Sequence, residues 1–166
     1  EFIKDTKDKK NICELSPGSF HCQGKIDWKI FRIMAELVEG FEFLTGLIDD
    51  VTVLGTKDVK PDSEFYQAAR ELGAKLAKMK HAVVTGGGPG IMEAANKGAF
   101  ESGGQSLGIN MKYGYRERVN PYVGKSIGFQ FPFVRKLIIT APSKAFIFFP
   151  GGFGTLHQFF EVLTLM

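Results

Sequence analysis

The sequence predicts a Rossmann-like α/β fold, with a doubly wound parallel sheet in a single domain. Apolar segments of strand length alternate with helical segments along most of the chain. Strands that are apolar throughout belong in parallel sheets, because helices cover both faces of such a sheet. Two of the strand-to-helix turns are also rich in glycine. A chain of 166 residues is long enough for one domain of this kind.

Five strands are expected, at residues 51–55, 81–85, 105–111, 125–131 and 144–149. A helix is expected from Asp27, a suitable N-cap residue. Its apolar residues recur at the spacing of one buried stripe: Trp28, Phe31, Met34, Ala35, Leu37, Val38 and Phe41. A second helix is expected from Pro61, with proline in its first turn, to about Met79. Further helices are expected at residues 90–102 and 133–140, and from about Thr155 onward.

Residues 1–26 form a polar lead-in that we expect to be partly disordered or to lie over the surface. Residues 27–166 are expected to form the nucleotide-binding domain, and its last helical pattern is still running at Met166, so we expect it to be truncated there. Cys13 and Cys22 both fall in the lead-in. Free thiols are favoured over a disulfide, and the spacing matches no metal site.

The composition is that of a globular protein, with 44% apolar and 23% charged residues. The net charge is +3, and the basic residues are scattered, which argues against a nucleic-acid partner and suits a small anionic ligand. No apolar run reaches the length of a membrane span, and the first residues lack the layout of a signal peptide. We expect a cytoplasmic protein with no membrane partner, no metal and no cofactor.

The two glycine-rich turns are the leading candidates for a binding site. Residues 85–90 read TGGGPG and residues 150–155 read PGGFGT, each directly after a strand. Glycine lets backbone N–H groups approach a ligand, and the helix that follows adds the positive end of its dipole. Neither turn has the dinucleotide fingerprint or the lysine of a P-loop, and glycines can also serve only to make tight turns. Two such turns at strand ends favour a phosphate-bearing ligand between them. The residues expected to bind it are Gly86, Gly87, Gly88, Gly151, Gly152, Gly154 and Thr155, the last with both a backbone N–H and a hydroxyl.

Polar residues near these turns have two explanations each. Arg135 lies at the start of an apolar helix. Its side chain is either solvated there or makes a bidentate contact to a phosphate group. Glu93 follows Met92 in the first turn of its helix, where it either complements the helix dipole or contacts a ribose. Gln158 and Glu161 are three residues apart and therefore neighbours on one face of the last helix.

Residues 86–99 (GGGPGIMEAANKGA) together with PGGFGT resemble the Lonely Guy (LOG) family, long mislabelled as lysine decarboxylases. The resemblance covers the chain from about Trp28 to Met166, and the first helix and the NPYV stretch at 120–123 resemble the larger bacterial branch of the family. It implies a phosphoribohydrolase that splits a purine nucleoside 5′-monophosphate, such as AMP or a cytokinin riboside monophosphate, into free base and ribose 5-phosphate. It also implies a homodimer or larger homo-oligomer. The decarboxylase label has no support, because no lysine here has a recognisable pyridoxal phosphate context.

The catalytic pair of that family is an Arg and the Glu of PGGxGTxxE. Arg135 falls at the Arg position, but Gln158 stands at the Glu position, and an amide cannot take a proton from water. Thr56 keeps a hydroxyl in a turn that is usually Gly-Ser in the family, and Met92 and Glu93 belong to the first glycine motif. Two hypotheses stay open. The protein is a hydrolase whose carboxylate comes from Glu161 or from a partner chain, or it binds the nucleotide without turnover.

Overall fold

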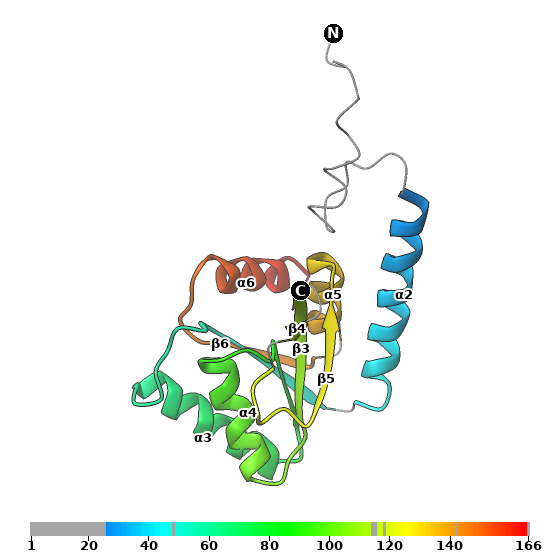
Figure 1. Ribbon diagram of the computed structural model, residues 1–166. Helices are drawn as coiled ribbons and strands as arrows, with labels where there is room; N and C mark the ends of the chain where they lie inside the picture. Colours follow the sequence, from blue (N-terminus) through cyan, green and yellow to red (C-terminus); the bar gives the residue numbers. More distant parts are fainter. Residues whose placement is uncertain (1–25, 48, 114–115, 118, 142, 166) are drawn as a thin grey trace.

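The computed structural model describes residues 26–165, except 48, 114–115, 118 and 142. A six-stranded sheet forms its centre (Figure 1). The strands are β1 (Asp50–Leu54), β2 (Ala82–Thr85), β3 (Ser106–Tyr113), β4 (Arg116–Glu117), β5 (Lys125–Phe129) and β6 (Ala145–Phe148). Five of them run parallel in the order β5-β3-β2-β1-β6, and β4 pairs antiparallel with β3. The predicted α/β fold with a parallel sheet is confirmed. The predictions for the polar lead-in and for Cys13 and Cys22 concern residues outside the described part of the chain.

Helices cover both faces of the sheet. On one face, α3 (Glu64–Lys78) and α4 (Ile91–Glu101) pack against each other and against the central strands (Figure 1). On the other face, α2 (Ile26–Leu44) packs with α5 (Pro132–Thr140). The last helix, α6 (Phe153–Leu165), directly follows β6. None of the described helices is long and apolar enough to cross a membrane.

Successive residues of the buried strands feed two separate cores, because neighbouring side chains of a strand point to opposite faces. In β2, Val83 joins the core under α3 and α4, whereas Val84 joins the core under α2 and α5. Both valines are fully buried. The apolar strands of the sequence are therefore explained by burial on both sides, as the parallel arrangement requires.

The predicted buried stripe on the first helix is wrong for all its residues except Leu37, which packs on the core. Trp28, Phe31 and Val38 are 74%, 61% and 66% exposed, and Met34 and Phe41 are also exposed. Beside Leu37, the face of α2 that packs on the core carries Ile33, Phe43 and Leu44. The helix is apolar on two faces, and its periodicity alone does not reveal which face the sheet covers.

Two helix starts and one strand also differ from expectation. Helix α3 begins at Glu64 with Ser63 as its N-cap, so Pro61 lies before the helix and not in its first turn. Helix α2 begins at Ile26, which places Asp27 inside it. The short strand β4 is not among the five predicted strands, because its pairing with β3 depends on the fold of the chain and not on local pattern.

The order of strands reverses at β1. From β1 the chain proceeds to β2, β3 and β5 on one side, and then returns to place β6 on the other side of β1. Loops leaving the carboxyl ends of β1 and β6 therefore diverge and leave a crevice between them, which is where open α/β sheets bind ligands.

Candidate functional site

A cleft of about 280 Å³ lies at this reversal point. Its lining residues come from the loop after β1, the start of α4, helix α5, and the turn and first residues of α6. They are Gly55, Thr56, Lys57, Asp58, Met92, Arg135, Gly152, Gly154, Thr155 and Gln158. Segments far apart in the sequence thus converge on one space, and seven of the residues expected to form the site line it.

Thr56 ties the loop after β1 to both glycine-rich segments. Its backbone N–H donates to the carbonyl oxygen of Pro150, 3.2 Å away, and its own carbonyl oxygen accepts the N–H of Ile91 at 3.0 Å. Gly90 has a φ of +73°, and a Cβ there would lie 2.6 Å from the Thr56 carbonyl oxygen. Only glycine allows both this backbone conformation and this close approach. The loop is therefore fixed between the two turns.

The first glycine turn packs directly against Arg135. A Cβ at Gly86 would collide with the guanidinium of Arg135 and would lie 2.8 Å from the sulfur of Met92. A Cβ at Gly88 would lie 2.8 Å from the methyl carbon of Met92. Glycine at these positions makes room for two side chains that line the cleft, so the turn shapes the site even though Gly86, Gly87 and Gly88 are not among its lining residues.

A buried polar network holds the same turn in place. The Thr85 hydroxyl accepts the N–H of Gly87 at 2.9 Å and donates to Oδ1 of Asn96 at 2.6 Å. The side-chain amide of Asn120 donates to the carbonyl oxygens of Gly87 and Gly88 and to Asn96. Asn96 and Asn120 are both buried. Buried polar groups paired in this way fix one arrangement of the turn. Neither residue was predicted to have this role from the sequence.

Asn110, on β3 beside this turn, has no partner of its own. It is 2% exposed, and neither polar atom of its amide makes a hydrogen bond. Its Cβ would lie 3.5 Å from a Cβ at Gly87. Leaving a buried amide unpaired costs roughly 1–3 kcal/mol, so a water molecule or a ligand group would be favourable there.

The second glycine turn faces open space. A Cβ added at Gly152 or Gly154 would meet no atom within 4 Å, and neither residue has a positive φ. These glycines are therefore required neither by packing nor by backbone conformation. The N–H of Thr155 already donates to the carbonyl oxygen of Gly152 at 3.0 Å, so its hydroxyl, which lies over Gly151, is the group left for a ligand. Gly151 itself is not among the lining residues.

Arg135 is positioned by two neighbouring elements. Its Nε donates to the carbonyl oxygen of Ile109 in the middle of β3, 2.7 Å away. The carboxylate of Glu36 on α2 accepts the N–H groups of Gln130 and Phe131, at 2.8 and 3.2 Å, just before α5 begins. A carboxylate at a helix N-terminus is favourable and fixes the direction of the helix. Arg135 is thereby held half-buried in the wall of the cleft.

Glu93 is engaged outside the cleft lining. Its carboxylate accepts a hydrogen bond from the hydroxyl of Tyr66, at 3.0 Å. Burial of Tyr66, followed by the hydrogen bond and negative charge of Glu93, raises the pKa of that hydroxyl to about 12. Tyr66 is 3% exposed. This contact links α3 to the first turn of α4, and no local pattern in the sequence predicts it.

Gln158 and Glu161 occupy different surroundings. Gln158 lines the cleft, whereas Glu161 does not. One oxygen of Glu161 is buried without a hydrogen-bond partner and lies 3.8 Å from Nδ1 of His157 on the same helix.

The cleft also contains Lys57 and Asp58, two residues that the sequence analysis did not predict to belong to the site. Their inclusion depends on how the loop after β1 folds back over Gly90, which no local motif reveals.

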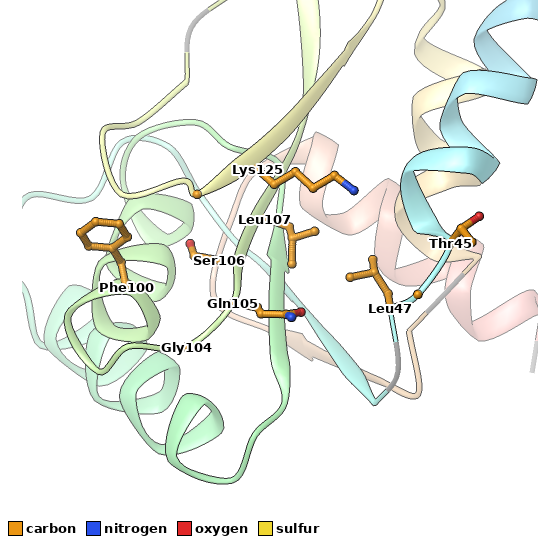
Figure 2. A pocket seen from close by; sticks show the side chains of 10 residues that line it. Thr45, Leu47, Phe100, Gly104, Gln105, Ser106, Leu107 and Lys125 are labelled. Atoms are coloured by element: carbon orange, nitrogen blue, oxygen red, sulfur yellow. The ribbon is translucent and has the colours of Figure 1, made fainter.

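A larger hollow, of about 450 Å³, lies at the opposite ends of the strands from this cleft (Figure 2). Its lining includes Gln105, Ser106 and Lys125, at the amino ends of β3 and β5. The Nζ of Lys125 donates to the carbonyl oxygen of Phe43 and lies 4.5 Å from the centre of its ring. Because its cation is engaged within the chain and ligands of parallel sheets bind at the carboxyl ends of strands, we assign the candidate site to the smaller cleft.

Two phosphoribohydrolases are similar in sequence to about three fifths of the chain. Cytokinin riboside 5′-monophosphate phosphoribohydrolase of Mycobacterium tuberculosis is 35% identical over 104 residues, which are 61% of this chain and 56% of that protein. LOG1, the enzyme of the same name from Arabidopsis thaliana, is 34% identical over 102 residues, which are 60% of this chain and 48% of that protein. The chain thus spans about half the length of these two relatives.

A carrier protein has a similar structure. The molybdenum cofactor carrier protein of Chlamydomonas reinhardtii superposes with a TM-score of 0.62 at 25% identity, over 70% of this chain and 71% of that chain.

The resemblance to the LOG family is confirmed by the named relatives. A profile of the SLOG cluster4 family matches residues 49–165, from the start of the sheet to the end of the last helix. The chain belongs to the SLOG cluster4 family.

Proposed function

We propose that the cleft binds a purine nucleoside 5′-monophosphate and that the protein hydrolyses its N-glycosidic bond to give the free base and ribose 5-phosphate. The observation that carries the proposal is the convergence of Arg135, Met92 and the turn after β6 on one space. The names of the two relatives support the same reaction.

The phosphate group is assigned to the start of α6. The first backbone N–H groups of a helix have no partner within it and carry the positive end of its dipole. In α6 the N–H groups of Thr155 and Leu156 already donate to the carbonyl oxygen of Gly152, so those of Phe153 and Gly154 are the ones assigned to the phosphate, beside the hydroxyl of Thr155. Arg135 supplies a full positive charge in the same lining. These groups complement a phosphate dianion.

The remaining lining suits the nucleoside. Met92 offers a polarizable apolar surface, which packs well against an aromatic ring such as adenine. Breaking the N-glycosidic bond leaves positive charge on the ribose, which a carboxylate stabilises, and a water molecule then completes the hydrolysis.

A nucleotide-binding protein without turnover is the second candidate. Gln158 lines the cleft at the position of the family's catalytic Glu, and a neutral amide neither stabilises a cation strongly nor accepts a proton from water. A structural neighbour that is named as a carrier protein is compatible with binding alone.

We also propose that the protein is a homodimer or larger homo-oligomer. The exposed apolar face of α2 carries Trp28, Phe31 and Val38, and a contiguous apolar surface of this kind is typical of an interface. Phe31→Glu should leave a folded chain of lower molar mass in light scattering. An unchanged mass would place the interface elsewhere or show a monomer.

The test of the function uses AMP. Free adenine is followed by chromatography, and AMP binding by calorimetry, for the wild type and Arg135→Ala. Loss of Arg135 should weaken binding at least tenfold, because a charge-assisted contact is removed, whereas Lys136→Ala on the same helix should not. Lys136 lies against His157 and is not among the lining residues. Absence of AMP binding by the wild type would refute the proposal. Binding without adenine release would favour the second candidate.

A further inference from the structure

The cleft contains a carboxylate that the family pattern does not anticipate. Among the lining residues that the structure describes, Asp58 alone carries a carboxyl group, and it belongs to the loop after β1. The position of the family's catalytic Glu is occupied by Gln158, which lies in α6 and not in the loop that carries Asp58. If the bond is hydrolysed, a carboxylate in the cleft therefore has to come from Asp58 or from outside the described residues.

The two other acids near the site have their neighbours outside the cleft. Glu93 accepts the hydrogen bond of Tyr66, and Glu161 lies beside His157. Neither lines the cleft. Asp58, by contrast, has an exposed side chain in a loop whose backbone is fixed.

The loop around Asp58 is ordered by three contacts. The N–H of Asp58 donates to the hydroxyl of Thr56 at 3.2 Å, which closes a tight turn. The backbone of Thr56 is bonded to Pro150 on one side and to Ile91 on the other. A side chain that reaches the cleft from a fixed backbone loses less freedom when it meets a ligand than one on a loose loop.

We propose that Asp58 is a catalytic residue, the carboxylate that acts on the ribose in place of the family's Glu. This inference rests on the proposed hydrolysis. The bond between C1′ and the base nitrogen breaks with its electron pair leaving on the base, and Asp58 stabilises the positive charge on the ribose. Asp58 then accepts a proton as the water oxygen bonds to C1′, and that proton is delivered to the base nitrogen directly or through solvent. The sum is AMP and water to adenine and ribose 5-phosphate, with no oxidation or reduction.

The test compares Asp58→Asn, Asp58→Glu and Asp62→Asn in the same chain, with AMP as substrate. Asp62 is an exposed acid in the same segment that is not among the lining residues, and so serves as the matched control. Asp58→Asn should lower kcat by about a hundred- to ten-thousand-fold, the usual contribution of an acid–base group. AMP should bind it as well as, or more tightly than, the wild type, because a negative charge beside a dianion is removed. Asp58→Glu should restore part of the rate, and Asp62→Asn should leave it unchanged.

The possible results of this test separate the role of Asp58 from the proposed function. Adenine release that is unaffected by Asp58→Asn overturns the role of Asp58 and leaves the proposed function standing, and loss of turnover in Glu161→Gln instead would move the carboxylate to α6. AMP binding by a wild type that releases no adenine overturns the role of Asp58, because it shows that the cleft lacks an effective carboxylate. Absence of AMP binding refutes the proposed function itself, and the inference with it. The thermal unfolding of each variant is compared with that of the wild type, so that a folding defect is recognised.

Discussion

The backbone N–H of Thr56 donates to the carbonyl oxygen of Pro150, so that the loop after β1 and the turn after β6 are joined at the mouth of the cleft. Both segments leave neighbouring parallel strands, since β1 pairs with β6. The carbonyl oxygen of Thr56 is in turn bonded to the start of α4. One residue therefore holds together the three segments that shape the site.

The first prediction concerns Gly154, where stability and binding should change in opposite directions. Its φ is not positive and no atom lies within 4 Å of an added Cβ, so alanine fits without strain. Gly154→Ala should raise the free energy of unfolding by about 0.4–1 kcal/mol, because alanine has less freedom to lose on folding. The same methyl group should project toward the phosphate position and weaken AMP binding.

Gly124→Ala is the matched control for this effect. Gly124 lies outside the cleft, and an added Cβ would come no closer than 3.5 Å to another atom. AMP binding by this variant should equal that of the wild type in calorimetry. Equal binding by Gly154→Ala would mean that the turn after β6 does not hold the phosphate.

The second prediction concerns the pH dependence of stability through Tyr66. Its pKa is raised from 10.0 to about 12 in the folded chain. Below pH 10 both states keep the proton and the contribution of Tyr66 is fully present. Between pH 10 and 12 the unfolded chain releases the proton first, so the free energy of unfolding should fall by about 1.4 kcal/mol per pH unit.

Tyr66→Phe isolates this contribution. Urea unfolding of the wild type and the variant at pH 9, 10 and 11 gives the difference between them, in which the titration of other groups largely cancels. The difference in favour of the wild type should shrink as the pH rises, since phenylalanine has no proton to release. A difference that stays constant over this range would show that the Tyr66 hydroxyl is not held in its neutral form by burial and Glu93.

The sequence was sufficient for the fold because its strands and turns obey local rules. Val83 and Val84 are both apolar, and only a strand covered on two faces needs that pattern. Gly90 has the positive φ that a tight turn requires, and its motif marks the place where a loop approaches closely. The apolar strands and the glycine turns depend on the residues at those positions themselves, so the sequence alone is enough to predict them.

The sequence was insufficient where a role depends on partners distant in the chain. Phe31 and Leu37 are both apolar residues of α2, yet one is exposed and the other packs on the core. Lys57 and Asp58 reach the cleft only because their loop folds over Gly90. The carbonyl oxygens of Gly87 and Gly88, which accept from Asn120, lie more than thirty positions away in the chain, and no local spacing predicts these contacts.

The last prediction concerns Gln158→Glu. If a carboxylate at the family position is better placed than that of Asp58, the variant should release adenine from AMP faster than the wild type, by at most about a hundred- to ten-thousand-fold, the full contribution of an acid–base group. Gln and Glu are nearly equal in size, so packing around α6 should not change, and AMP binding should weaken only through the added negative charge near the phosphate. The double variant Asp58→Asn/Gln158→Glu should keep the raised rate, because a carboxylate is still present in the cleft. A rate that Gln158→Glu leaves unaltered, but that Glu161→Gln abolishes, would assign the carboxylate to Glu161. If neither the wild type nor Gln158→Glu releases adenine while AMP still binds, the cleft holds a nucleotide without cleaving it.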